Sequence, residues 1–442
     1  MAESQRRKVE HGARTSRVPG FYKLTVAQRL ERLCQWQPLS AEEKRHLCQE
    51  SLPLDKADMM IENVIGIFGM PLGVATNFRI NGKDYLVPMA IEETSIVAAA
   101  GNSAQLIRDN GTLTAQCEAT VMEGQIQLTD VPDIDKAIKL IEGSKERLLK
   151  LANEQDRMLV SLGGGARKLY CRKIETESGP MLIVHLAVDV RDAMGANAVN
   201  TMVETLGPLI ADLAKGDLHL RIITNYCDRS LARARFEVKV DCLQWGPYSG
   251  KQVAERLVRA YHFADADPYR ATTHNKGVMN GIDGILIATG NDWRAVEAGC
   301  HAYAARTGRY RSLTRYRISS TGVPAGEMLV GEIELPLAVG LVGGVTKLHP
   351  VAAIVLKLLG VTRRSELAEV IACAGLLQNF AAMRALVTAG IQKGHMALHA
   401  RNVACFAGAD GELAVKVAEQ MEREGKVGFD RAKQIIEQLR GK

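Results

Sequence analysis

The sequence predicts a multidomain protein of mixed α+β and α/β type. A large helix-rich domain carries an inserted ferredoxin-like α+β domain and ends in a small helical flap. The chain has 442 residues, enough for two or three domains. Between residues 113 and 215, two long helical patterns alternate with paired strands, and no G-x-G-x-x-G follows a parallel strand, so this unit is not a Rossmann domain. The predicted units are a basic tail at 1–20, the large domain at 21–112 and 216–391, the inserted domain at 113–215 and the flap at 392–442.

The composition is that of an ordinary globular protein, with 47% hydrophobic and 24% charged residues. The most apolar stretch, 351–359, is interrupted by Lys357, and the N-terminus lacks the apolar run of a secretory signal. We therefore expect a cytoplasmic protein without a membrane partner. The nine cysteines form no C-x-x-C pair, and His395 with His399 lacks a third ligand, so reduced thiols and no metal site are expected.

The net charge of +6 comes partly from five basic residues among the first seventeen. A basic tail can bind nucleic acid, and such binding would be sensitive to salt. A solvated tail is the simpler interpretation, because the aromatic content is only 5% and no stacking platform is visible. The distributed basic residues also suit an anionic substrate such as a phosphorylated cofactor. We expect no nucleic-acid partner.

The N-terminal part is predicted to contain short helices followed by a hairpin. Capping boxes at 25–28 and 40–43 each precede helix-forming residues. From residue 73 the sequence alternates with period two on both sides of Asn81-Gly82, the strongest short hairpin signal. We therefore expect strands at about 73–80 and 83–90.

The inserted domain is predicted from its strands and helices. Strands at 114–122 and 125–129 precede a helix at 133–160, whose apolar residues recur at helical spacing. Three glycines at 163–165 precede a hairpin, and the loop D-A-M-G-A-N at 192–197 then opens a second long helix. Two helices against an antiparallel sheet give a sandwich of ferredoxin-like type.

The chain then returns to the large domain through a charged segment at 270–294. This segment holds six ionisable side chains among glycines and apolar residues, which would be costly to desolvate in a plain core. We therefore interpret it as the functional centre. The other expected elements are a strand at 218–225, helices at 250–264 and 292–306, strands at 312–319 and 327–334, and helices at 349–360, 364–390, 411–424 and 428–440. The last two are short and joined through glycines, as in a flap that excludes water.

Three side chains are candidates for catalysis, and each also has a structural explanation. Glu93, at the junction after the second hairpin strand, can stabilise a helix N-terminus, Asp292 can cap the next helix, and Lys276 can lie on the surface. We instead expect Lys276 to be buried between the two carboxylates. Such an arrangement would perturb all three pKa values and keep one acid protonated near neutrality.

Nine motifs follow one another along the chain. They are E-N-V-I-G at 62–66, N-G-K-D-Y-L-V-P at 81–88, E-E-T-S at 92–95, S-L-G-G-G at 161–165, D-V-R-D-A-M-G-A-N at 189–197, H-N-K-G-V-M-N-G-I-D at 274–283, A-T-G-N-D-W-R-A at 288–295, G-L-V-G-G-V-T-K at 340–347 and G-H-M-A-L-H-A-R-N at 394–402. Together they resemble the soluble, mostly prokaryotic class II form of 3-hydroxy-3-methylglutaryl-coenzyme A reductase, in the family's order. Thr94 departs from the family, which usually has proline there.

The resemblance implies a reduction of hydroxymethylglutaryl-CoA to mevalonate and free coenzyme A by two hydride transfers. Glu93 resembles the proton donor and Lys276 the cation that polarises the carbonyl. Asp292 resembles the residue that couples these two, and His395 the acid that protonates the departing thiolate. These residue types suit a reaction that needs an oxyanion stabiliser, protons and a captured leaving group.

Further positions resemble contacts to the substrate. Ser95, Arg270 and Asn280 match residues that hold the hydroxymethylglutaryl group, and the guanidinium of Arg270 suits its free carboxylate. Gln378 and Ala382 resemble contacts to the coenzyme A part of the substrate.

For the nicotinamide cofactor the resemblance points to the inserted domain and the strand after it. A glycine loop that opens a helix offers backbone N–H groups to a pyrophosphate. Asp156 matches a position beside the adenine ribose, where a carboxylate accepts from a 2′-hydroxyl and repels a 2′-phosphate, so NAD(H) is favoured and NADP(H) remains the alternative. The other cofactor positions are Asp192, Met194, Gly195, Ala196, Asn197 and Asn225.

The resemblance also implies a homodimer with active sites shared at the subunit interface, which can assemble further into a hexamer as a trimer of dimers. One alternative keeps the enzyme and reverses its direction, so that NAD-dependent oxidation of mevalonate serves catabolism. Another is a family member that has lost activity, which the joint presence of the four catalytic residue types argues against.

Overall fold

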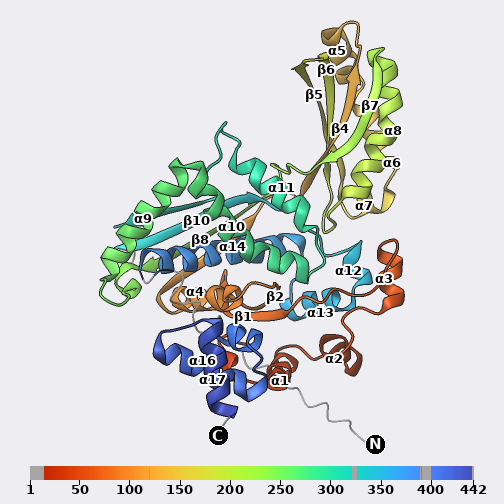
Figure 1. Cartoon of the computed structure of the whole chain (residues 1–442). Helices are drawn as coiled ribbons and strands as arrows, with labels where there is room; N and C mark the ends of the chain where they lie inside the picture. Colours follow the sequence, from red (N-terminus) through yellow and green to blue (C-terminus); the bar gives the residue numbers. More distant parts are fainter. Residues whose placement is uncertain (1–13, 119, 321–325, 389, 391–399, 441–442) are drawn as a thin grey trace, which may run out of the picture.

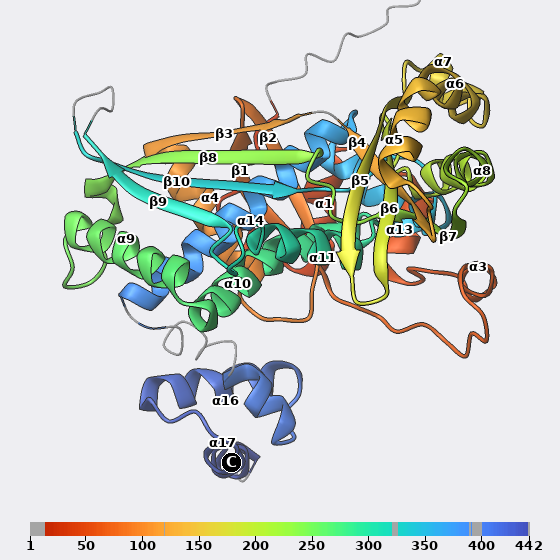
Figure 2. The ribbon, with the colours of Figure 1, turned by 90° about the horizontal axis from the view of Figure 1, so that it is seen from above.

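The computed structural model describes residues 14–440 except 119, 321–325, 389 and 391–399. Figure 1 shows a large body from which a smaller unit, built of β4–β7 and α5–α8, projects at one end. Two C-terminal helices, α16 (Gly411–Glu424) and α17 (Phe429–Arg440), pack together around their own apolar core. Figure 2 shows this helical pair set apart from the large body. The predicted fold class is confirmed.

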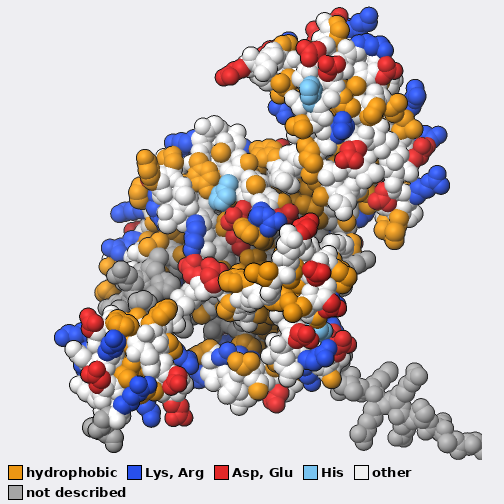
Figure 3. Space-filling model, turned by 45° about the vertical axis from the view of Figure 1, so that its right-hand side comes forward, with side chains coloured by type: hydrophobic (Ala, Val, Ile, Leu, Met, Phe, Trp, Pro, Cys, Tyr) orange, Lys and Arg blue, Asp and Glu red, His pale blue; other side chains and the backbone are white. Residues whose placement is uncertain are grey.

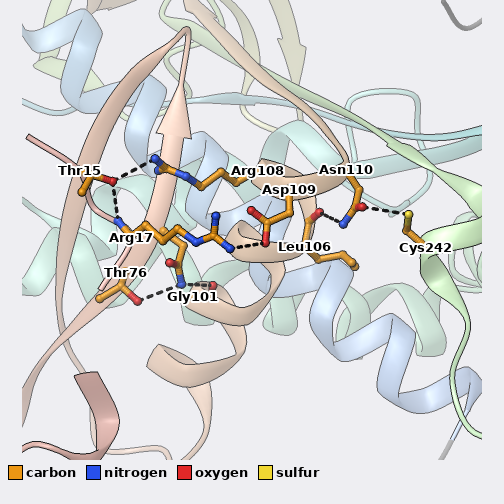
Figure 4. Close-up of polar contacts among 10 residues, drawn as sticks. Thr15, Arg17, Thr76, Gly101, Leu106, Arg108, Asp109, Asn110 and Cys242 are labelled. Atoms are coloured by element: carbon orange, nitrogen blue, oxygen red, sulfur yellow. Dashed lines mark hydrogen bonds and ion pairs between the residues drawn. The ribbon is translucent and has the colours of Figure 1, made fainter. Parts of the chain in front are cut away.

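The N-terminal segment 14–17, which belongs to the predicted basic tail at 1–20, is bound to the large domain. Ser16 is fully buried. Its hydroxyl donates to the carbonyl of Phe78 at 2.8 Å, and its N–H donates to Asp84 at 2.7 Å. Figure 4 shows Arg108 donating to Thr15 beside it. Residues 1–13, with three of the five basic side chains, lie outside the described residues.

The first helices and the hairpin confirm the local predictions. Both capping boxes form, with Thr25 and Ser40 as the N-cap residues. Asn81 and Gly82 both have positive φ, 51° and 81°, as a type I′ turn requires. The elements are η1 (Phe21–Lys23), α1 (Val26–Trp36), α2 (Ala41–Cys48), α3 (Leu54–Met60), β1 (Leu72–Ile80), β2 (Lys83–Ala90) and α4 (Ile96–Asn110).

An antiparallel sheet and a central helix organise the large domain. The sheet has the order β3-β8-β10-β9, and its face is covered by α14, which packs against β3, β8 and β10, and by α9, which packs against β9 (Figure 2). The helix α10 packs on α14 and α9. The central helix is α14 (Arg364–Val387). It carries apolar side chains on all sides, as expected for a helix enclosed by its neighbours. The elements are β3 (Gly111–Cys117), β8 (Leu231–Lys239), η2 (Val240–Leu243), α9 (Gly250–Ala266), α10 (Pro268–Ala288), α11 (Trp293–Ala304), β9 (Thr314–Ser319), β10 (Met328–Pro336), α12 (Val345–Leu348), α13 (Pro350–Leu359) and α14 (Arg364–Val387).

Among the described residues, α14 is also the one helix that is long and apolar enough to cross a membrane. Its most apolar window is 72% buried inside the fold, where it packs against α10, α4 and three strands of the sheet. The apolar composition of α14 is therefore that of a core helix.

The inserted domain has the ferredoxin-like order β5-β6-β4-β7, with all strands antiparallel and α5, α6 and α8 packed against the sheet. Gly124 lets α8 approach closely, since a Cβ there would lie 2.6 Å from the side chain of Val203. The elements are β4 (Val121–Thr129), α5 (Ile134–Gly143), α6 (Lys145–Glu154), α7 (Arg157–Ser161), β5 (Gly165–Thr176), β6 (Gly179–Asp189), α8 (Ala196–Ala214) and β7 (Asp217–Thr224).

Strand pairing corrects two predicted strands at the limits of the inserted domain, and helix caps correct one predicted helix inside it. The expected strand at 114–122 is divided, because β3 pairs with β8 in the large domain and β4 begins only at Val121. The strand near 218–225 belongs to the inserted domain, because β7 pairs with β4. The helix expected at 133–160 is divided into α5, α6 and α7. Ser144 is the N-cap of α6, and Asp156 is the N-cap of α7.

Candidate active site

Lys276 and Glu93 form an ion pair at the surface of the large domain. Lys276 lies on α10, and Glu93 lies in the turn between β2 and α4. The expected burial of Lys276 is wrong, because its side chain is 59% exposed and that of Glu93 is 38% exposed. The buried face of α10 carries residues such as Asn275 and Val278, so helical geometry turns Lys276 away from the core. The ammonium group is therefore accessible to a substrate.

Asp292 has a different set of contacts from the one expected. Its carboxylate is the N-cap of α11 and accepts from the N–H of Ala295 at 3.1 Å. A second contact is an ion pair with Arg294 at 3.7 Å. Within the described part of the chain, Lys276 therefore pairs with one of the two predicted carboxylates, and the capping role of Asp292 is confirmed.

Ser95 stands at the N-terminus of α4 with a positive φ of 72°. A left-handed conformation is uncommon for a residue other than glycine and is often found where the surrounding structure imposes it at a functional site. The helix that follows directs its positive dipole end towards the turn that holds Glu93. The turn therefore favours negative charge next to the ammonium of Lys276.

Arg270 and Asn280 extend the site along α10. The guanidinium of Arg270 is half-buried, and burial lowers its pKa from the ordinary value. It donates to the sulfur of Met383 at 3.5 Å, a weak acceptor, and no carboxylate among the described residues pairs with it. Asn280 lies one helical turn after Lys276 and is partly buried. A free carboxylate on a ligand would supply the counter-charge that Arg270 lacks.

The two residues predicted to contact coenzyme A differ in their exposure to solvent. Ala382 is partly exposed on α14, as a contact residue requires. Gln378 is buried, with its β-carbon close to Gly281 of α10. Gln378 thus lies where α10 and α14 meet, and its contact with coenzyme A stays a prediction. Its amide oxygen has no hydrogen-bond partner among the described residues.

His395 and His399 lie outside the described residues, so the structure does not place the predicted thiolate acid. Within the described ranges, no group of three or more His, Cys, Asp and Glu side chains is arranged to hold a metal ion. Figure 3 shows Lys and Arg interspersed with Asp and Glu on the face in view.

The loop at 192–197 joins β6 to α8 and opens towards the large domain. Gly195 has a φ of 92°, and a Cβ there would collide with the side chain of Val190. Asp192 is tied to the large domain, since its carbonyl accepts from Leu341 and its carboxylate from the N–H of Arg364, both at 2.8 Å. The free N–H groups at the start of α8 suit a pyrophosphate.

Asp156 and Asn225 occupy two further positions predicted for the cofactor. Asp156 is the N-cap of α7, where its carboxylate accepts from Leu159 at 2.8 Å. Asn225 is exposed at the end of β7, and its carbonyl faces Gly299 of α11. These two positions and the loop at 192–197 lie at the same end of the inserted sheet. The first residues of β4 and β5 both pair with Asp189 at the end of β6, and Thr224 at the end of β7 pairs with Glu123 near the start of β4.

Two arginines gather beside α7. Arg167 and Arg191 both donate to the carbonyl of Gly163, just after that helix, and both lie within 4 Å of Asp189. One carboxylate thus faces two guanidinium groups, which leaves positive charge near the predicted ribose position. Neither arginine was predicted as a site residue, because only the fold brings them together.

A carboxyl pair between α10 and α11 was also not assigned a role from the sequence. Asp283 hydrogen-bonds to Glu297, and one of its oxygens is buried without a partner among the described residues. Burial, together with this hydrogen bond and the negative charge of Glu297, raises the pKa of Asp283 to about 8. The pair lies two helical turns beyond Lys276 and holds a proton at neutral pH.

Comparisons with known proteins agree with this arrangement. The family model of hydroxymethylglutaryl-coenzyme A reductase matches residues 25–400. The 3-hydroxy-3-methylglutaryl-coenzyme A reductase of Archaeoglobus fulgidus is 52% identical over 428 residues, which cover 97% of this chain and 96% of that protein. A structure of the Streptococcus pneumoniae enzyme is 40% identical with a TM-score of 0.80, covering 95% of this chain and 99% of that one. Another, described as the class II enzyme bound to NADPH in open conformations, is 42% identical with a TM-score of 0.80 and covers 84% and 99%.

Proposed function

Because this chain belongs to the hydroxymethylglutaryl-coenzyme A reductase family, we propose that the site around Lys276 and Glu93 reduces hydroxymethylglutaryl-CoA to mevalonate and coenzyme A. The accessible ion pair between these residues is the observation that carries the proposal. The similar proteins are named as reductases, which favours the reductive direction over mevalonate catabolism.

The chemistry of the site follows from its charges. The nicotinamide dinucleotide supplies two hydrides when bound. The ammonium of Lys276 stabilises the negative charge that develops on the thioester oxygen and then on the aldehyde oxygen. Glu93, in direct contact with this ammonium, delivers the proton, and His395 protonates the thiolate of coenzyme A. Asp292 couples Glu93 and Lys276 through the local field, from its position at the start of α11.

Substrate binding is assigned to three residues on the same surface. The guanidinium of Arg270 binds the free carboxylate of the hydroxymethylglutaryl group, because it is partly desolvated and lacks a carboxylate partner in the described chain. Ser95 and Asn280 orient the hydroxyl and carboxylate from the start of α4 and from α10. Ala382 contacts the coenzyme A chain from α14.

The dinucleotide binds at this end of the inserted sheet, with its pyrophosphate at the loop 192–197. The left-handed conformation of Gly195 at the N-cap of α8 supports this assignment, because the first N–H groups of a helix have no partner within the helix. We assign a preference for NADH to the carboxylate of Asp156, which repels a 2′-phosphate. Arg167 and Arg191 supply countercharge nearby, so NADPH is accepted with lower efficiency.

A homodimer is supported by an exposed apolar segment. Residues 61–71 run along the surface without regular structure until β1 begins, and the side chains of Ile65 and Phe68 are almost fully exposed. A contiguous apolar surface of this kind marks an interface with another protein chain. We assign it to a second copy of the protein, in a cytoplasmic enzyme whose active sites lie at the subunit interface.

Turnover measured with purified protein tests the proposed function. Oxidation of NADH or NADPH is followed in the presence of hydroxymethylglutaryl-CoA for the wild type, Lys276→Met and Lys251→Met. Lys251 is a matched control, because its side chain on α9 is 60% exposed and pairs with Glu327. We expect turnover by the wild type and the control only. Equal turnover by Lys276→Met would contradict the assignment.

A further inference from the structure

The segment that leaves β10, residues 337–341, lies between the two halves of the proposed site. Leu337 to Gly340 are buried, and the segment passes the turn before α11 on one side and the loop at 192–197 on the other. The N–H of Gly340 donates to the side-chain oxygen of Asn291 at 2.8 Å. The next N–H, of Leu341, donates to the carbonyl of Asp192, also at 2.8 Å. Two adjacent backbone N–H groups thus contact Asn291, which precedes Asp292, and Asp192. Asp192 is the first residue of the loop at 192–197, which we call the cofactor loop.

Close packing makes this arrangement sensitive to small displacements. A Cβ on Gly340 would lie 2.5 Å from the backbone nitrogen of Met194, so the cofactor loop rests directly on the segment. A further backbone bridge joins Ala193 to Val342. Because protein interiors are closely packed, a shift of the 337–341 segment is transmitted to the loop and is not absorbed.

Arg364, the first residue of α14, holds this segment from inside the protein. Its side chain is 1% exposed. The guanidinium donates to the carbonyl of Val339 at 2.5 Å and to that of Leu337 at 3.0 Å. Its backbone N–H donates to the carboxylate of Asp192 at 2.8 Å. One residue therefore contacts both the segment and the cofactor loop.

The guanidinium of Arg364 is an unusual choice for a purely structural position. No carboxylate among the described residues forms an ion pair with it, and one of its nitrogens is buried without a partner. Burying a charge without an opposite charge is costly, and an apolar side chain of similar size would often stabilise a core more. Its donors are, however, well suited to fix two carbonyls of a segment that continues the chain beyond Pro336, the last residue of β10 in the ladder with β8.

We infer that Arg364 is a positioning residue for hydride transfer: by fixing the carbonyls of Leu337 and Val339, it sets the cofactor loop relative to Asn291 and Asp292. This inference rests on the proposed function, which assigns the loop to the dinucleotide and Asp292 to catalysis. Displacements of about 1 Å in a reacting geometry can reduce rates by up to about 100-fold. Loss of the guanidinium therefore impairs use of the dinucleotide more than binding of hydroxymethylglutaryl-CoA.

Steady-state kinetics of Arg364→Met and Arg364→Lys in the full-length enzyme test the inference. For Arg364→Met, kcat/KM for the reduced dinucleotide is expected to fall about 10- to 100-fold, with KM for hydroxymethylglutaryl-CoA changed less than about twofold. Arg364→Lys retains a buried donor and is expected to recover part of the loss. If Arg364→Met does not fold, Gly340→Ala displaces the same loop directly and is expected to show the same split between the two substrates.

Glu366→Gln is the matched control, since Glu366 is also buried near the start of α14 but binds Lys83 and Tyr85 of β2. It is expected to lower thermal stability without changing the ratio of the two KM values. The inference would be overturned if folded Arg364→Met had an unchanged kcat/KM for the dinucleotide. It would also be overturned if kcat/KM fell equally for both substrates in the Arg364 variants and in Glu366→Gln. An inactive wild type and control would instead contradict the proposed function.

Discussion

Lys276 of α10 and Glu93 of the β2–α4 turn form an ion pair between segments separated by 183 residues. The helix positions the ammonium, and the turn positions the carboxylate. Both groups remain accessible, so a substrate oxygen can approach the ammonium while the acid is in contact with it. Exposed ion pairs contribute little to stability, about 1 kcal/mol or less. We therefore expect the Lys276–Glu93 pair to serve catalysis and to add little to the stability of the fold.

Loss of the cation should abolish catalysis and leave the fold intact. For Lys276→Met, kcat is expected to fall by at least about 10²- to 10³-fold, as for removal of an oxyanion donor. The melting temperature should match that of Lys251→Met, whose exposure is similar. A large loss of thermal stability in Lys276→Met alone would show that the pair has a structural role.

Removal of the guanidinium at Arg270 should weaken substrate binding. Hydrogen bonds to a charged group contribute about 1.5–3 kcal/mol, so KM for hydroxymethylglutaryl-CoA should rise about 10- to 100-fold in Arg270→Met. The KM for the dinucleotide should stay within about twofold of wild type. Arg256→Met is the control, because its guanidinium on neighbouring α9 contacts Val387 and Tyr248. Equal effects of the two substitutions would argue against a carboxylate site.

A neutral residue at position 156 should alter the choice of dinucleotide. Asparagine caps helices about as well as aspartate, so Asp156→Asn removes the charge while keeping the start of α7. The ratio of kcat/KM for NADPH to that for NADH should increase about tenfold, equivalent to about 1.4 kcal/mol. Steady-state kinetics of the wild type and of the variant with each dinucleotide measure this ratio. An unchanged ratio would assign the preference to other residues.

The Asp283–Glu297 pair should make stability depend on pH. The folded chain keeps the proton on Asp283 up to its raised pKa of about 8, whereas the unfolded chain releases it near the ordinary value of 3.8. The free energy of unfolding therefore loses this contribution as pH rises between these values, and the contribution is complete below the lower one.

Asp283→Asn removes this dependence, because the amide stays neutral. The melting temperature of the variant relative to wild type should increase between about pH 5 and about pH 8, the interval over which the folded protein retains the proton. Asp135→Asn, at an exposed position on α5, is the control and should show a constant difference. A constant difference for Asp283→Asn as well would contradict the assigned proton.

Local sequence signals predicted much of the fold. The turn Asn81-Gly82, the capping residues Thr25 and Ser40, and the helix at 411–424 depend on contacts between residues a few positions apart. The same holds for Glu93 and Asp292, which were correctly placed at helix starts. Strand partners were predicted less well, because period-two alternation marks a strand without showing which strand it pairs with. For this reason β3 and β7 were assigned to the wrong domains.

Residue types and their order along the chain were sufficient to predict the family, the fold class and the segments that hold the candidate site, since these depend on local chemistry. Only the tertiary structure decided the exposure of Lys276, the raised pKa of Asp283 beside Glu297, and the burial of Arg364 against the 337–341 segment. Burial and charge pairing arise from segments that are distant in sequence, and both the pKa values and the geometry of a site depend on which segments the fold brings into contact.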